Sequence, residues 1–316
     1  MTKEQIINKL VEAFDINEIF AHRVYSLVNK KEDLMSEAYQ LISEKPKPFV
    51  KWVGGKRQLL NQFKLLNLYP PKQFDPLRAR YYEPFVGGGA VFFDLLPRSA
   101  FLSDLNKELI TTYAVIKNNV EDLIQSLKVH KIEKEYFLKI RAFDTNMLSD
   151  LEIASRFIYL NRTCFNGLYR VNKKGQFNVP FGKYKRPLIC DQDNLRKVSK
   201  ALQSVELRTG DYSEILDFVK KGDFIYLDPP YYPLNRTSSF TAYTKEGFLE
   251  EEQIKLRDVF FELDKKGCFV MLSNSDTSFI RKIYSDAKVT EVLAGRMINA
   301  NALKRGRILE LVIINY

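Results

Sequence analysis

Apolar, strand-like runs that alternate with helical patterns constrain the fold of this chain more than any other feature. The runs lie at residues 81–86, 100–104, 223–228, 268–272 and 308–314, and helical patterns at 105–127 and 250–265 lie between them. Strands that are apolar along their whole length are typical of a sheet covered on both faces, and their alternation with helices is typical of α/β folds. The sequence therefore predicts an α/β fold.

The interval from about residue 113 to residue 210 breaks this alternation. Its pattern predicts helices over 120–141 and 151–159, followed by a basic hairpin that contains glycine and asparagine. We therefore expect an inserted domain at 113–205 and a sheet domain formed by residues 46–112 and 206–316. Residues 1–45 show apolar residues at helical spacing, and Pro46 and Pro48 end that pattern. The sequence thus predicts a separate helical N-terminal extension.

The formal net charge of +10 is concentrated in one part of the chain. Residues 156–190 contain eight lysines and arginines and no aspartate or glutamate, whereas residues 1–45 contain six basic and eight acidic residues. Seven aromatic residues are interleaved with the cations of the basic stretch. Such a surface suits a partner that presents phosphates and bases, and a solvated basic face is the alternative.

The composition excludes several classes of protein. With 45% hydrophobic and 13% aromatic residues the chain is not expected to be disordered. No uncharged apolar run approaches the roughly 18 residues of a membrane span, and charges interrupt the first residues, so we expect neither a membrane segment nor a secretory signal. The three cysteines form no Cys-x-x-Cys pair and only two histidines are present, so we expect reduced thiols, no metal site and a cytoplasmic location.

The first motif that carries chemistry is Gly87-Gly88-Gly89, which directly follows the run at 81–86. Glycines between a strand and a helix let the backbone approach a ligand closely. Asp104 ends the next strand-like run, 17 residues after Gly87, at the distance where an acidic residue binds ribose hydroxyls in nucleotide folds. This pattern indicates a nucleoside-containing cofactor, although a tight turn without a ligand is the alternative. The spacing differs from G-x-G-x-x-G, which disfavours NAD.

The second motif is Asp228-Pro229-Pro230-Tyr231, at the end of the most apolar run. Ligands in open α/β sheets bind at the carboxyl ends of strands. Pro230 restricts Pro229 to an extended conformation, which aims the Pro229 carbonyl rigidly beside the Asp228 carboxylate. Two acceptors and an aromatic face suit a planar group that bears an exocyclic amine. A proline turn with a satisfied aspartate is the alternative.

The third motif, residues 48–57, contains Trp52, the single tryptophan, followed by Gly54, Gly55 and Lys56. An aromatic ring beside glycines and a lysine can form the wall of a nucleoside or sulfonium pocket. Taken alone, the motif is better explained by a core tryptophan next to a turn.

Together the three motifs resemble those of the Dam-type DNA adenine-N6 methyltransferases, the α group of amino-methyltransferases. The resemblance extends from about Pro48 to Tyr316, and it includes residues 160–162, 165–170 and 177–184 of the insert. It implies the Rossmann-like fold of S-adenosylmethionine-dependent methyltransferases, with a helical and hairpin target-recognition domain inserted between the cofactor and catalytic motifs. It also implies S-adenosylmethionine as cofactor and double-stranded DNA, with a GATC-like site, as partner.

The resemblance further assigns roles to individual residues. The implied catalytic residues are Asp228, Pro229, Pro230 and Tyr231. The implied cofactor residues are Trp52, Lys56, Glu83, Phe85, Gly87, Asp104 and Asp228. The implied DNA-binding residues are Lys51, Arg162, Phe165, Asn166, Leu168, Arg170, Pro180 and Tyr184. Position 165 is often tyrosine in the family, and Lys51 and Lys56 lie where the family approaches both cofactor and DNA.

These residues imply a reaction on an adenine that is flipped out of the duplex. Asp228 and the Pro229 carbonyl would accept the two N6 hydrogens, and Tyr231 would stack on the ring. The alternatives are an RNA or cytosine-N4 methyltransferase, a DNA-binding regulator without activity, and an oxidoreductase. We expect the enzyme on DNA in a bacterial or phage-infected cell, and a restriction–modification role is one possibility. The N-terminal extension lies outside the resemblance, and we expect it to pack on the core or on another protein.

Overall fold

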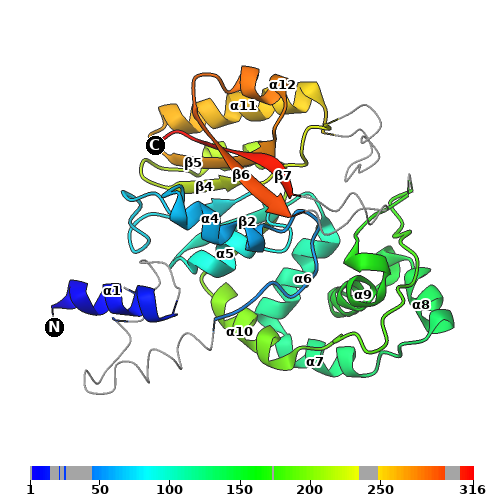
Figure 1. Ribbon diagram of the computed structural model, residues 1–316. Coiled ribbons are helices and arrows are strands. Elements are labelled where there is room, and N and C mark those ends of the chain that lie inside the picture. The colour runs from blue at the N-terminus through cyan, green and yellow to red at the C-terminus, as the bar shows by residue number, and fades with distance from the viewer. Residues whose placement is uncertain are drawn as a thin grey trace.

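The computed structural model describes residues 2–14, 21, 25, 45–172, 174–234, 248–295 and 307–316. Within these residues the chain forms a seven-stranded sheet of order β3-β2-β1-β4-β5-β7-β6 (Figure 1). The strands are β1 (Tyr81–Glu83), β2 (Ala100–Asp104), β3 (Val205–Thr209), β4 (Phe224–Leu227), β5 (Phe269–Ser275), β6 (Lys288–Gly295) and β7 (Arg307–Ile314). The sheet confirms the α/β fold class, and each expected apolar run contains a strand.

Two strands, β3 and β6, were not expected from the sequence. Both lie at an edge of the sheet, and their residues alternate between buried and exposed positions or are largely exposed. An edge strand that is half covered has no continuous apolar run, so the criterion that identified the central strands does not detect it.

Strand direction decides where the functional loops meet. The neighbours in the order β3-β2-β1-β4-β5 are all parallel, and β7 lies antiparallel between β5 and β6. The chain runs outward from β1 through β2 to β3 and then returns to the other side of β1 as β4. The order of strands therefore reverses between β1 and β4, which is the point where open α/β sheets bind their ligands.

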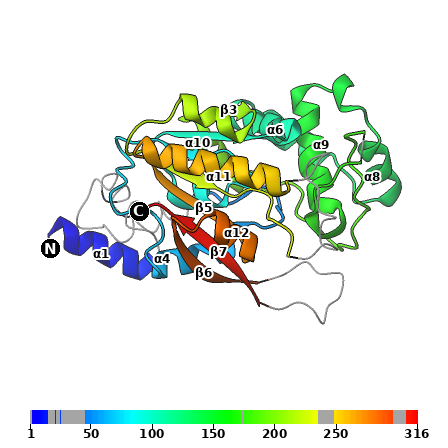
Figure 2. The ribbon, with the colours of Figure 1, turned by 90° about the horizontal axis from the view of Figure 1, so that it is seen from above.

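Helices cover both faces of the sheet because adjacent residues of a strand point to opposite sides. Tyr81 and Phe224 pack in one buried cluster, while their neighbours Tyr82 and Ile225 pack in the other. One face is covered by α11 (Glu250–Lys265) and α12 (Ser278–Ile283), and the other by α4 (Leu60–Leu65), α5 (Ala90–Leu95), α6 (Lys107–Asn118) and α10 (Gln192–Leu202) (Figures 1 and 2).

The expected insert forms a helical region beside the sheet (Figure 1). Its helices are α7 (Val120–Lys128), α8 (Lys134–Arg141) and α9 (Asp150–Thr163), and α9 begins at a capping box made by Ser149 and Glu152. After α9 the chain forms a hairpin with isolated bridges between Cys164 and Phe181 and between Val171 and Phe177. The expected start of the insert, residue 113, falls inside α6, whose Tyr113 packs in the core under the sheet.

The N-terminal extension is described only in part. α1 (Lys3–Phe14) has the expected helical pattern, with Ile6, Ile7 and Leu10 buried, and it lies at the opposite end of the molecule from α8 (Figures 1 and 2). The other expected helices of residues 1–45 lie outside the described residues. Among the residues that are described, no helix is long and apolar enough to cross a membrane, and no group of three metal-ligating side chains occurs.

Candidate active site

The loop after β1 carries the glycines and is built for close contact. Gly87 and Gly89 have φ angles of +46° and +67°, the left-handed region that favours glycine. A Cβ atom on Gly87 would lie 2.5 Å from the indole nitrogen of Trp52, and one on Gly89 would lie 2.7 Å from the Tyr113 hydroxyl. Both glycines are therefore required for the backbone to pass between these rings.

Asp104 lies where the sequence predicts it, at the end of β2 beside the glycine loop. Its carboxylate accepts hydrogen bonds from the backbone N–H of Gly87 (3.1 Å) and of Asn106 (3.0 Å). Burial raises the pKa of Asp104 to about 6, and the two N–H donors oppose that rise because they favour the charged form. A buried carboxylate is thus held at the mouth of the glycine loop.

Trp52 joins the glycine loop to the insert. Its ring stacks on Phe157 of α9, with centroids 6.4 Å apart, and on Tyr169 of the hairpin, with centroids 5.9 Å apart. The same ring lies against Gly87. The single tryptophan is therefore part of an aromatic wall rather than an isolated core residue.

Asp228 follows β4 and forms an ion pair with Lys56. The Lys56 ammonium lies 2.7 Å from Asp228 Oδ1, donates to the Gly54 carbonyl at 2.6 Å and lies 4.8 Å from the centre of the Tyr231 ring. Only 3% of Lys56 is exposed. Burial raises the pKa of Asp228 to about 6, although Lys56 opposes the rise, and the carboxylate is ionised above that pH.

Buried polar side chains fix the loop after β4. The Tyr231 hydroxyl donates to Glu310 of β7 at 2.8 Å. The Gln253 amide on α11 donates to the Pro230 carbonyl at 3.0 Å and accepts from the Asn274 amide at 2.9 Å. Both amides are fully buried. Sequence analysis missed three residues of this candidate site: Glu310, Gln253 and Asn274. The one signal that could have found them is a polar residue at a position where the strand or helix pattern is otherwise apolar.

Glu83 is the last residue of β1, and Phe85 lies in the glycine loop that follows it. The buried Glu83 carboxyl accepts from the Tyr81 hydroxyl (2.9 Å) and from the Phe92 N–H (3.1 Å), and burial raises its pKa to about 8. Phe85 stacks on Tyr212 with centroids 5.2 Å apart. Tyr212 follows Gly-Asp at the end of β3, a signal of a strand-end loop that sequence analysis did not use.

The expected DNA-binding residues gather on the end of α9 and the following hairpin. Phe165, Asn166, Arg170 and Pro180 are exposed, and the exposed fraction of Phe165, 49%, is high for a large aromatic side chain. The Phe165 N–H donates to the Pro180 carbonyl at 2.9 Å, which holds the two residues together. Arg170 donates to the Asn178 side chain at 2.7 Å.

The remaining expected DNA-binding residues are partly buried or interact with residues 48–57, the segment that contains Trp52. Leu168 packs on the cluster between α8 and α9. The Lys51 ammonium lies 4.2 Å from the centre of the Tyr184 ring, so Lys51 lies at the hairpin whereas Lys56 lies at Asp228. Arg162 donates to the Phe49 carbonyl at 2.7 Å and points into the molecule rather than toward the hairpin surface.

Two cations of the basic stretch do not lie on its exposed face. Arg156 is 4% exposed and pairs with Glu108 at 2.9 Å, and Arg162 binds a backbone carbonyl. A count of charges along the sequence does not show which side chains turn inward to satisfy buried acceptors. Lys174, Lys183 and Lys185 are exposed, and Lys173 lies outside the described residues.

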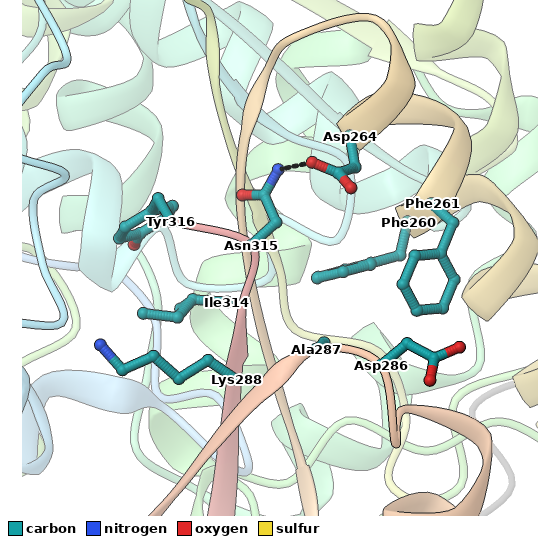
Figure 3. A pocket seen from close by; sticks show the side chains of 9 residues that line it. All are labelled: Phe260, Phe261, Asp264, Asp286, Ala287, Lys288, Ile314, Asn315 and Tyr316. Carbon is teal, nitrogen blue, oxygen red and sulfur yellow. Dashed lines mark hydrogen bonds between the residues drawn. The ribbon is translucent and has the colours of Figure 1, made fainter.

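A cavity of about 160 Å³ lies at the other end of the sheet, between the end of α11, the start of β6 and the end of β7 (Figure 3). Ile314 at the end of β7 pairs with Met271 near the start of β5. The cavity therefore lies at the amino ends of the parallel strands, opposite to their carboxyl ends. Asn315 lines it and donates to Asp264 at 2.7 Å (Figure 3). It is therefore separate from the candidate active site.

Comparisons with known proteins agree with this geometry. The family model described as D12 class N6 adenine-specific DNA methyltransferase matches residues 52–298. The chain is 44% identical over 278 residues to the type II methyltransferase M1.LlaDCHI of Lactococcus lactis subsp. cremoris, covering 85% of this chain and 95% of that protein. It is 45% identical over 288 residues to the type II methyltransferase M.MjaIII of Methanocaldococcus jannaschii, covering 85% and 99%. It is 36% identical over 277 residues to a DNA adenine methylase of Haemophilus influenzae, covering 85% and 94%.

Proposed function

Because the chain belongs to the D12 class of N6 adenine-specific DNA methyltransferases, we propose that it methylates the adenine of GATC after flipping that base out of the duplex. The enzyme class, the adenine substrate and S-adenosylmethionine as methyl donor follow from the family. The sequence GATC, the flipped base and the role of each residue are our proposal. The observation that supports this proposal is that Asp228, the glycine loop and the hairpin residues lie together at the carboxyl ends of the parallel strands.

The residues after β1 and β2 fit the methyl donor. Gly87 and Gly89 let the loop backbone lie directly against the Trp52 ring and the Tyr113 hydroxyl, and Asp104 supplies a carboxylate of the kind that binds ribose hydroxyls. We assign Trp52 and Phe85 to the aromatic walls of this site, and Glu83 to the support of the loop through its bond to Phe92. When bound, S-adenosylmethionine supplies an electrophilic methyl group on a sulfonium.

In this proposal Asp228 and Pro229 accept the two hydrogens of adenine N6. The N6 lone pair is delocalised into the ring, and two acceptors draw the nitrogen toward a tetrahedral geometry in which the lone pair is available for attack. Tyr231 stacks on the base. Its hydroxyl is held by Glu310, and Pro230 is held by Gln253, so the loop is positioned before the base arrives.

The ion pair of Lys56 has a consequence for this mechanism. The ammonium pairs with Oδ1 of the carboxylate that the proposal assigns to the adenine amine, and it lies 4.8 Å from the centre of the Tyr231 ring that the proposal assigns to the base. An incoming base therefore competes with Lys56 for Asp228.

We assign sequence recognition to the hairpin and to Lys51, within the insert expected at residues 113–205. Leu168, Arg170, Pro180 and Tyr184 are the candidates for base contacts, and the exposed Phe165 and Asn166 are candidates to fill the gap left by the flipped adenine. Arg162 supports this surface through its hydrogen bond to the Phe49 carbonyl.

The biological setting belongs to the same proposal. Two of the relatives are named type II methyltransferases, which favours a role in restriction–modification. Because the substrate is DNA, we propose that the enzyme acts in the cytoplasm of a bacterial or phage-infected cell. For the N-terminal extension we propose packing on the core or on another protein.

The test is to incubate the purified protein with unmethylated DNA and S-adenosylmethionine and to map the modified bases by sequencing. We expect N6-methyladenine in GATC, and none with Asp228→Ala, which should still bind DNA. Modified cytosine, modified RNA or an adenine in another site would contradict the proposal. A duplex with 2-aminopurine at the target position tests flipping separately, because its fluorescence rises when the base leaves the stack.

A further inference from the structure

Two buried asparagines hold one segment of the chain by the same pair of hydrogen bonds. The segment, residues 47–56, is called the strap below. Asn161 accepts from the Lys51 N–H at 2.8 Å and donates to the Lys51 carbonyl at 2.8 Å. Asn194 accepts from the Lys47 N–H at 2.8 Å and donates to the Lys47 carbonyl at 2.9 Å. The exposed fractions are 1% for Asn161 and 8% for Asn194, so both pairs are shielded from water.

The two asparagines differ in what else they bind. The Asn161 amide also donates to the Gly167 carbonyl at 3.0 Å, and Gly167 lies in the hairpin that carries the candidate base contacts. Asn194 lies in the first turn of α10, which packs on α6 and α7. Asn161 therefore joins the strap to the hairpin, whereas Asn194 joins it to the helical layer under the sheet.

Lys51 and the hairpin are in close contact around this junction. A Cβ atom on Gly167 would lie 2.5 Å from Lys51 Cδ, so the glycine allows the lysine side chain to lie directly on the hairpin backbone. That side chain continues to the Tyr184 ring. A shift of the hairpin relative to the Lys51 backbone would displace the ammonium from this ring.

The strap leads from this junction to the active site. Trp52, the next residue, lies against Gly87 of the cofactor loop, and Lys56 pairs with Asp228. Only four residues separate Lys51 from Lys56. The hairpin and the reacting groups are thus connected through one short piece of backbone, and Asn161 holds the end of that piece at the hairpin.

We propose that Asn161 is a positioning residue for sequence discrimination, which holds Lys51 and the hairpin in one fixed arrangement so that a correct site on DNA is coupled to the active site. This inference rests on the proposed site-specific methylation of DNA. Without Asn161 the Lys51 backbone and the Gly167 carbonyl lose their shared partner, and the hairpin can bind an incorrect site without moving the strap. The Asn194 pair makes no such connection and serves only to attach the strap.

The test compares Asn161→Ser with Asn194→Ser as a matched control. Each substitution removes the two bonds to one strap residue, and Asn161→Ser also removes the bond to the Gly167 carbonyl, so we expect both variants to fold with lowered melting temperatures and Asn161→Ser to melt first. For each protein kcat/KM is measured on a cognate duplex and on duplexes with one base pair changed. A partly inactive preparation cancels in the ratio of the two values.

We expect the ratio to fall about tenfold in Asn161→Ser and to stay at the wild-type value in Asn194→Ser, an effect in the range that mutations between coupled sites produce. Equal ratios in the two variants, changed or not, would overturn the inference. If Asn161→Ser does not fold, Gly167→Ala disturbs the same junction from the hairpin side, because the added methyl group would lie 2.5 Å from Lys51 Cδ, and it must show the same loss. A wild-type protein that does not discriminate among sites would instead refute the proposed function, and this inference with it.

Discussion

Replacing Glu83 by glutamine should change how the free energy of unfolding depends on pH. In the wild type Glu83 releases a proton on unfolding, and glutamine does not. The Glu83 carboxyl is 2% exposed, and burial raises its pKa from the ordinary 4.5 to about 8, against the opposing hydrogen bond from Tyr81. Glutamine keeps the size of the side chain and an acceptor for the Tyr81 hydroxyl and the Phe92 N–H, but it does not titrate.

The sign and the magnitude follow from the shift. Between the two pKa values the folded protein holds a proton on Glu83 that the unfolded chain releases, so the free energy of unfolding declines as pH rises through this window. One such proton contributes a slope of about 1.4 kcal/mol per pH unit, or about 3 kcal/mol between about pH 5 and about pH 7. Below about pH 4.5 and above about pH 8 the contribution is constant.

The assay is urea unfolding of the wild type and of Glu83→Gln at several pH values, followed by the fluorescence of Trp52. Because Trp52 is the single tryptophan and lies in the aromatic wall of the site, its signal reports the loss of this packing. Asp104 and Asp228, whose pKa values burial raises to about 6, titrate in both proteins, so most of their contribution cancels in the difference; the part that remains is the charge of Asp228 acting on Glu83, which raises the pKa of Glu83. We expect the stability of the variant relative to the wild type to increase with pH by the slope given above.

A difference between the two proteins that stays constant from about pH 5 to about pH 7 would refute the reasoning. It would mean that Glu83 is ionised in the folded protein and that burial does not control its charge. If the stability of the variant relative to the wild type instead decreased as pH rises, this would also contradict the reasoning, because it requires a lowered pKa of Glu83.

Three further predictions concern activity and binding. Single-turnover methyl transfer should decline as pH falls below about 6, because burial raises the pKa of Asp228 to that value and the protonated acid is a poorer acceptor; a flat rate–pH profile would count against this. Gly87→Ala should weaken S-adenosylmethionine binding in calorimetry, because the added methyl group would lie 2.5 Å from the indole nitrogen. Gly222→Ala, at a positive φ with open space around it, controls for backbone strain and should leave that affinity unchanged. Neutralising Lys183 and Lys185 with glutamine should reduce the slope of log Kd against log salt by about one unit for each DNA phosphate that these lysines no longer neutralise. An unchanged slope would show that these lysines are only solvated.

The sequence by itself determined the fold class and the chemistry at the strand ends. Fully apolar runs identify central strands because both of their faces are buried, and glycines or prolines directly after such runs have few conformations available. The loop at Gly87 and the tetrapeptide that begins at Asp228 were predictable for this reason, since their geometry depends on neighbouring residues in the chain. The order of the motifs supplied the resemblance to DNA adenine-N6 methyltransferases.

Only the tertiary structure decided which distant residues support those loops. Glu310 reaches Tyr231 because β7 inserts antiparallel beside β5, and no local pattern specifies that pairing. Asn161 meets Lys51 across 110 residues, and Arg162, next to it, turns inward to a backbone carbonyl although it belongs to the basic stretch. Local sterics and apolar periodicity act between neighbours in sequence, whereas the partner of a buried polar group is set by how the elements pack.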